Sequence, residues 1–146
     1  LRRPDSVSVI ATVDGKILVQ EEERPDLAKP FISLPGGRAD RNGDPLGEAK
    51  RELLEETGYR SNAVISLNKP TWLDPCVFTV PYYPFLALGC ERVMEQDLDA
   101  NEKIEVEVVP MHAWLQKIWN REIDDSKSIA TTLLAFPHLG ISVSFS

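Results

Sequence analysis

Hydrophobic and polar residues alternate along much of the chain, and the spacing of this alternation predicts a series of short strands. Residues 6–20 contain two β-rich runs joined at Asp14-Gly15, a dipeptide typical of a tight hairpin turn. Pro81 and Pro84 interrupt a later run, which we therefore expect to be bent, bulged or placed at a sheet edge. The further strand-like segments are the start of 31–45, 61–68, 76–90 and 104–109.

Stretches typical of helices separate these strands. The first begins after Asp44, the expected N-cap, has Pro45 in its first turn and ends before Gly58. The next runs from Pro110 to about Ile118, and the last covers about 126–136. Because strands and helices are interleaved, the sequence predicts an α/β fold with a mixed β-sheet between helices, in a single domain of residues 1–146.

The first helix carries an unusual acidic face. Glu48, Glu52 and Glu56 follow one another at four-residue steps, and Glu55 lies three positions beyond Glu52. Residues three and four apart share a helix face, where each like-charged pair destabilises the helix by roughly 0.2–0.5 kcal/mol. Arg51 flanks this face and is well spaced to pair with Glu55. The residues expected to pack on the sheet lie on another side of the helix: Leu46, Ala49, Leu53 and Thr57.

Two interpretations of the acidic face are open. It is either a solvated surface, as runs of charge usually are, or a cation site close to the glycine-containing loop 34–37. Carboxylate and carbonyl oxygens are the ligands that hard divalent cations prefer, and Mg²⁺ adds water and substrate phosphates to one or two protein carboxylates. A bound cation would also relieve the repulsion between the glutamates, so we favour the metal site.

Composition narrows the function classes. The 146 residues are 42% hydrophobic and carry a net charge of −7, which argues against a general nucleic-acid-binding surface. No apolar run approaches the length of a membrane span, so we expect no membrane partner and a cytoplasmic location. Cys76 and Cys90 have no zinc or redox spacing, and both are expected to be buried free thiols.

Residues 36–59 resemble the Nudix box, whose usual form is G-x5-E-x7-R-E-U-x-E-E-x-G-U, where U is a bulky apolar residue. Tyr59 takes the final bulky position, but Gly43 stands where the first glutamate is usual. Asp44 follows directly and either replaces that glutamate or only caps the helix, which we take as its main role. The matching residues are Gly37, Arg51, Glu52, Leu53, Glu55, Glu56 and Gly58.

The resemblance implies an α/β/α sandwich and hydrolysis of nucleoside diphosphates linked to another moiety, with Mg²⁺ or Mn²⁺ as cofactor. It implies that Glu52 and Glu56 are the principal metal ligands, that Glu55 assists, and that the Gly36 carbonyl completes the site. Arg51 would orient these carboxylates rather than touch the substrate.

Features outside the box resemble the ADP-ribose pyrophosphatase subgroup, which cleaves ADP-ribose to AMP and ribose 5-phosphate. These features are Pro75, an acidic loop before the strand 104–109, and the closing segment 119–136. By this resemblance Glu102 activates water, although a solvent-exposed loop carboxylate is an equal alternative and Asp97 and Asp99 are weaker candidates.

By the same resemblance Arg24 contacts the substrate, and Arg38, in the glycine-rich loop, is placed to reach its phosphates. The alternative for Arg24 is a loop salt bridge with Glu21 or Glu22, and Arg38 could simply balance nearby acids. Arg41 lies in the same loop as Arg38, so the same two interpretations apply to it.

The subgroup usually has a further N-terminal segment that helps to hold adenine and forms a swapped dimer. Only about six residues precede the first strand here, so substrate recognition differs, the chain is incomplete, or the substrate is another nucleotide. A homodimer is thus one oligomeric state open to the chain. The alternatives to ADP-ribose are an oxidised nucleoside triphosphate, a dinucleoside polyphosphate or another sugar nucleotide. A non-catalytic ligand sensor is the remaining class.

Overall fold

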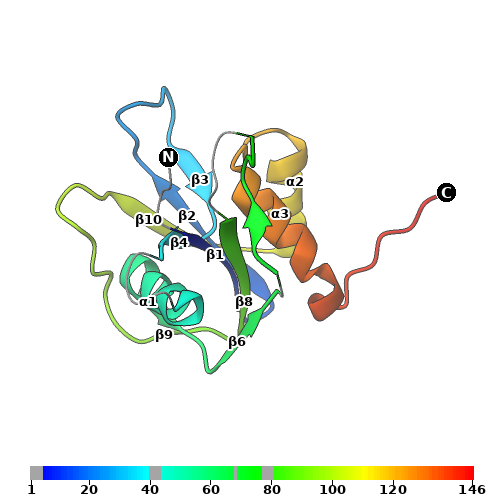
Figure 1. The fold of residues 1–146 in the computed structure, drawn as a ribbon, viewed down its shortest axis with the longest axis horizontal. Coiled ribbons are helices and arrows are strands. Elements are labelled where there is room, and N and C mark those ends of the chain that lie inside the picture. The colour runs from blue at the N-terminus through cyan, green and yellow to red at the C-terminus, as the bar shows by residue number, and fades with distance from the viewer. Residues whose placement is uncertain (1–4, 40–43, 68, 77–80) are drawn as a thin grey trace.

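A mixed β-sheet forms the centre of the computed structural model, which describes residues 5–39, 44–67, 69–76 and 81–146 (Figure 1). The strands are β1 (Ser6–Val13), β2 (Lys16–Glu22), β3 (Phe31–Ser33), β4 (Gly36–Arg38), β5 (Tyr59–Arg60), β6 (Ala63–Ser66), β7 (Thr71–Trp72), β8 (Pro81–Leu88), β9 (Glu91–Arg92) and β10 (Ile104–Val109). The helices are α1 (Pro45–Thr57), α2 (Met111–Trp119) and α3 (Ser126–Ala135), followed by the 3₁₀ helix η1 (Phe136–Leu139).

The predicted hairpin is confirmed at Asp14 and Gly15. Both residues have positive φ, 50° and 75°, as a tight turn between paired strands requires. The turn joins β1 to β2, with Val13 opposite Lys16.

The main path of the sheet runs β10-β2-β1-β8-β6, with β3 paired to β2, β4 to β1 and β7 to β8. Only β1 and β8 pair in parallel among the described strands, so the sheet is mixed, as predicted. The strand β8 lies inside the sheet rather than at an edge, despite Pro81 and Pro84. Its partner β6 pairs with residues 85–88 and β7 with residues 81–82, so Pro84 lies where the pairing on that side is interrupted.

Helices cover both faces of the sheet (Figure 1). Odd-numbered residues of β1, such as Val7 and Val9, pack with Leu53 of α1 in one buried cluster. Ile10 of the same strand packs with Trp114 of α2 in a second cluster on the opposite face. Successive side chains of a strand point to opposite faces, so this alternation produces three layers, and the predicted α/β/α arrangement is confirmed.

The boundaries of α1 agree with the prediction, since Pro45 begins the helix and Gly58 ends it with φ 78°. The last helix agrees with the prediction to within one residue. It ends at Ala135 because Pro137, which has no N–H, falls in the 3₁₀ turn that follows. Leu46 was predicted to pack on the sheet but is 40% exposed.

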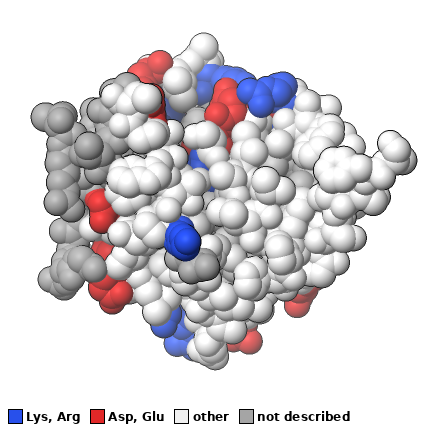
Figure 2. All heavy atoms as spheres, turned by 45° about the vertical axis from the view of Figure 1, so that its right-hand side comes forward, with Lys and Arg blue, Asp and Glu red and all other residues white. Residues whose placement is uncertain are grey.

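Charge is unevenly distributed over the surface. The face shown in Figure 2, on the side of α2 and α3, is largely uncharged, with acidic and basic side chains mainly at its margin. Within the described ranges, no helix is long and apolar enough to cross a membrane. Of the two free cysteines Cys90 is buried, as expected, but Cys76 is exposed, because it lies in a turn outside the sheet.

Candidate active site

The loop between β3 and β4 is anchored on two sides. The Leu34 N–H donates to Ser128 Oγ on α3 at 2.9 Å, and the Val9 N–H of β1 donates to the Pro35 carbonyl at 2.8 Å. Gly36 then pairs with Ser8 at the start of β4. The loop is therefore held between the sheet and α3, where its backbone faces the acidic side of α1.

Arg51 organises the carboxylates of α1. Its guanidinium contacts Glu48 at 2.7 Å, Glu52 at 2.8 Å and Glu55 at 2.6 Å. The pairing with Glu55 was predicted from the sequence and is confirmed. The hydrogen bond to Glu48 and the nearby negative charges raise the pKa of Arg51, so the guanidinium stays protonated. Glu48 was expected on the exposed acidic face of the helix. It is instead buried, where it accepts a hydrogen bond from Arg51.

Glu52 and Glu56 form an acidic pair, of which Glu56 is buried and Glu52 half-buried. Glu56 is 6% exposed, and its Oε2 accepts a hydrogen bond from the Gly36 N–H at 3.2 Å. Burial and repulsion from Glu52 raise the pKa of Glu56 to about 9. Burial also raises the pKa of Glu52, although Arg51 opposes this shift. Within the residues that the structure describes, Glu56 has no basic partner, so the pair lacks a full complement of positive charge.

The acidic loop before β10 is fastened to the end of α1. The Gln96 amide donates to the Glu56 carbonyl at 2.6 Å, and the Asp97 N–H donates to the Glu55 carbonyl at 2.8 Å. Glu102 is half-buried, and its side chain accepts a hydrogen bond from the Asp99 N–H at 2.9 Å. The charge of Glu102 is close enough to contribute to the raised pKa of Glu56.

A cavity of about 1100 Å³ brings the predicted site residues together. It lies between the loop 34–37, the acidic face of α1 and the acidic loop, which are distant in the sequence. The predicted residues that line it are Arg24, Gly36, Arg38, Arg51, Glu52, Glu55, Glu56 and Glu102, together with the weaker candidates Asp97 and Asp99.

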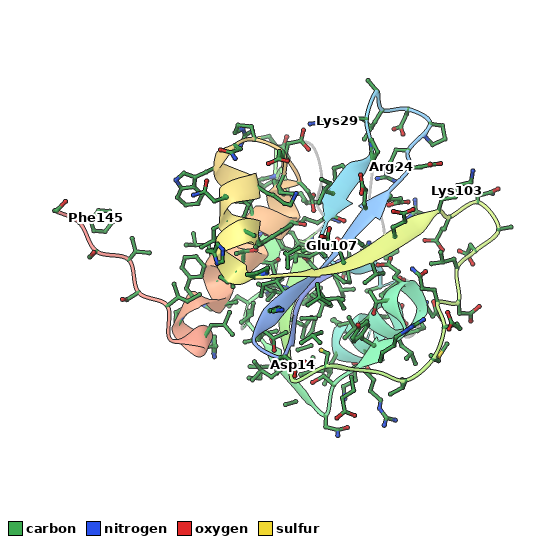
Figure 3. All side chains as sticks on the ribbon, turned by 180° about the vertical axis from the view of Figure 1, so that it is seen from behind. Asp14, Arg24, Lys29, Lys103, Glu107 and Phe145 are labelled. Carbon is green, nitrogen blue, oxygen red and sulfur yellow. The ribbon has the colours of Figure 1, made fainter. Side chains whose placement is uncertain are left out.

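Arg24 lies at the border of this cavity and a smaller one of about 360 Å³. Its guanidinium stacks over the Phe31 ring at 5.4 Å from the centroid and lies 4.0 Å from Glu22. The smaller cavity is also lined by Lys29 and Lys103, and Figure 3 shows all three cations at the end of the molecule opposite the Asp14 turn. Arg24 both pairs with Glu22 and lines the cavity, so the salt bridge does not exclude a substrate-binding role.

Among the cavity residues that were not singled out from the sequence are Gln20, Asp125 and Lys127. Gln20 is the polar residue that ends the otherwise apolar run 17–20, and this break in the pattern was the available signal. Asp125 and Lys127 lie at the start of α3. They line the cavity because the hydrogen bond between Leu34 and Ser128 holds this end of α3 against the loop. No local sequence pattern reveals such a long-range contact. Lys127 is half-buried and has no ion-pair partner in the described part of the chain.

Asp44 occupies the N-cap position of α1, but its side chain accepts no capping hydrogen bond. The prediction that the Asp44 carboxylate mainly caps the helix is therefore wrong. The carboxylate lies beside Gly47 without making a capping hydrogen bond. Asp44 does not line the cavity either. Gly43, where the box departs from its usual form, and Arg41 lie outside the described residues.

The donor set at Glu52 and Glu56 fits a small divalent cation. In the described ranges no three His, Cys, Asp or Glu side chains form a metal-holding group. Mg²⁺ does not require such a group, because it binds through one or two carboxylates and completes its shell with water and phosphate oxygens. The buried Glu56 and the half-buried Glu52 are the carboxylates available for such a cation.

Comparisons with known proteins show the family of this chain. The NUDIX domain family matches residues 2–130, and this chain therefore belongs to the Nudix family. It is a Nudix hydrolase with relatives of the ADP-ribose pyrophosphatase type, and members of this family generally use divalent metals and act on small nucleotide substrates.

Two relatives and one solved structure illustrate the similarity. An ADP-ribose pyrophosphatase of Bacillus subtilis (strain 168) is 30% identical over 134 residues, covering 88% of this chain and 70% of the relative. The methanol dehydrogenase activator of Bacillus methanolicus is also 30% identical, over 135 residues, with the same coverage of 88% and 70%. The crystal structure of an ADP compounds hydrolase matches with a TM-score of 0.80 at 20% identity, covering 94% of this chain and 75% of that chain, which confirms the fold.

Gly37 provides a test of the position of Glu52. A Cβ built on Gly37 would lie 2.6 Å from Glu52 Oε1, so an alanine must displace that carboxylate. We expect Gly37→Ala to lower the rate of hydrolysis about tenfold, a loss of about 1.4 kcal/mol of transition-state stabilisation. The free energy of unfolding should change by less than about 0.5 kcal/mol, because only the flexible end of a side chain must move. Steady-state kinetics and urea unfolding measure the two effects.

Gly47→Ala is the matched control. A Cβ there would lie 2.5 Å from Asp44 Oδ2, so it also displaces a flexible carboxylate, but one outside the cavity. We expect an unchanged rate and a small gain in stability from the better helix propensity of alanine. A rate loss in Gly47→Ala equal to that in Gly37→Ala would contradict this account and give Asp44 a part in the site.

Proposed function

We propose that this Nudix hydrolase cleaves the diphosphate of a nucleoside diphosphate linked to another moiety. ADP-ribose is the proposed substrate, and AMP and ribose 5-phosphate are the proposed products. The observation that carries the proposal is a cavity of about 1100 Å³ lined both by the carboxylates of α1 and by basic side chains. The similarity to the Bacillus subtilis protein named ADP-ribose pyrophosphatase supports the choice of substrate.

The proposal includes Mg²⁺ or Mn²⁺ as cofactor. Glu52 and Glu56 are the proposed principal ligands, assisted by Glu55 and the Gly36 carbonyl. When bound, such a cation neutralises the negative charge that develops on the diphosphate during cleavage. The three ion pairs of Arg51 support a role in orienting the carboxylates rather than in binding substrate.

The remaining steps are assigned to side chains of the cavity. Glu102 accepts a proton from the attacking water, whose oxygen forms a bond to one phosphorus of the diphosphate. The bond from that phosphorus to the bridging oxygen breaks, and the bridging oxygen leaves with the other phosphate. Arg24, Arg38 and Lys127 line the cavity and are available to bind the anionic substrate.

A substrate panel tests the proposed function. The protein is incubated with ADP-ribose, an oxidised nucleoside triphosphate, a dinucleoside polyphosphate and another sugar nucleotide, each with Mg²⁺ or Mn²⁺. We expect the highest kcat/KM with ADP-ribose and equal amounts of AMP and ribose 5-phosphate by chromatography. A higher kcat/KM with another nucleotide would make that nucleotide the substrate in place of ADP-ribose. No turnover of any compound would favour a ligand sensor.

Glu102→Gln tests the proposed base. Glutamine keeps an oxygen that can accept the hydrogen bond from the Asp99 N–H, so the loop should retain its structure. It cannot accept the proton from water, and we expect kcat to fall roughly 100-fold, with a much smaller change in KM. The exposed Glu105→Gln on β10 is the control, with expected wild-type kinetics. Equal kcat values for Glu102→Gln and the wild type would assign proton transfer to another group.

A further inference from the structure

Gln20 is a polar residue in a buried part of β2. It is 4% exposed, and its neighbours across the sheet are Ser33 of β3 and Val106 of β10. Leu18, two residues earlier on the same face, belongs to the core beneath α1. Since strands pair with β2 on both sides at this point, the position of the Gln20 backbone is fixed.

The Gln20 side chain and Glu56 line the same cavity, and the amide lies near enough to lower the pKa of the Glu56 carboxylate. The carbonyl Oε1 of Gln20 is buried and has no hydrogen-bond partner. A buried amide carbonyl without a partner destabilises the folded state, and an apolar side chain of similar size would avoid this loss. The benefit of an amide at this position must therefore come from its contact with Glu56.

Two elements thus bring donors to the Glu56 carboxylate. The Gly36 N–H donates to it at 3.2 Å from the start of β4, and the Gln20 amide lies beside it on β2. Donors that originate in two fixed strands restrict the rotamer of a long side chain, which is otherwise free to turn.

We propose that Gln20 is a positioning residue, which holds the Glu56 carboxylate in the orientation that binds the divalent cation. This inference rests on the proposed function, since it assumes that Glu56 is a metal ligand. Hydrogen bonds to the ligands of metal sites commonly change metal affinity by 10- to 100-fold when they are removed.

Mn²⁺ binding to the substrate-free protein, measured by electron paramagnetic resonance, tests the proposal independently of turnover. Gln20→Met keeps the length and flexibility of the side chain but removes the donor, and Gln20→Leu is a second apolar variant. We expect both to raise the Kd for Mn²⁺ at least tenfold, while the Tm of the metal-free protein is unchanged or higher. Thr131→Val is the matched control, because it removes another buried, unpartnered polar atom, on α3 outside the cavity. It should bind Mn²⁺ like the wild type.

Glu56→Gln separates the two hypotheses. Wild-type Mn²⁺ affinity in both Gln20 variants, together with lost binding in Glu56→Gln, would overturn the role of Gln20 and leave the proposed function intact. Equal binding in the wild type and Glu56→Gln would overturn both. Loss of folded structure in both Gln20 variants, seen by circular dichroism, would also overturn the proposal, because the amide would then be needed for the fold.

Discussion

Glu56→Gln is expected to lower the rate of hydrolysis by at least two to three orders of magnitude, about 3–4 kcal/mol of activation free energy. Glutamine has nearly the size of glutamate and a similar helix propensity, but it is a much weaker ligand for a hard cation. Its amide N–H groups would also compete with the Gly36 N–H that donates to Glu56 in the wild type. Initial rates over a range of Mg²⁺ concentrations measure the loss.

The same variant should fold at least as stably as the wild type in the absence of metal. Burial and Glu52 raise the pKa of Glu56 to about 9, well above the ordinary value for glutamate. The ionised form therefore destabilises the folded state, and this contribution grows as the pH rises from about 4.5 towards 9. A neutral glutamine removes it. Near-wild-type activity at limiting Mg²⁺ would show that the metal site lies elsewhere.

Arg51→Leu is expected to lower the free energy of unfolding by roughly 2–3 kcal/mol and the rate of hydrolysis more than 100-fold. Removing one partner of a fully buried ion pair usually costs about 3–5 kcal/mol. The effect should be smaller here because the Arg51 side chain is 25% exposed, whereas that of Glu48 is 8% exposed. The rate falls because Glu52 and Glu55 lose the cation that orients them.

Arg92→Leu is the control for this prediction. Arg92 also pairs with a glutamate three positions away, Glu95, but the two side chains are 57% and 90% exposed. Its loss should change the free energy of unfolding by less than about 0.5 kcal/mol and leave the rate unaltered. Urea unfolding of both variants measures the comparison. Equal changes in the free energy of unfolding for Arg51→Leu and Arg92→Leu would contradict the prediction that the burial of Glu48 strengthens its ion pair with Arg51.

Features fixed by local chemistry could be predicted from the sequence. Asp14-Gly15 specifies its turn through backbone conformation, and Pro45 and Gly58 mark the ends of α1 for similar reasons. The spacing of Arg51 and Glu55 also fixes their contact, because one helical turn separates them.

Features that depend on long-range packing could not be predicted. The burial of Glu48 depends on how α1 meets the sheet, and helical periodicity placed it with the other glutamates. The contact of Gln20 with Glu56 joins a strand to a helix across the loop 34–37. Cys76 was expected to be buried from its residue type alone, but its segment lies outside the core.

The hydrogen bond between Leu34 and Ser128 has a consequence for the order in which the protein acquires its structure. It joins residues 94 positions apart, and β1 likewise pairs with β8 only after α1 and β6 have been made. During synthesis the acidic residues of α1 therefore leave the ribosome well before the segment that anchors the neighbouring loop. The nascent chain must carry these carboxylates without their final surroundings, and the cavity that they line forms late in folding.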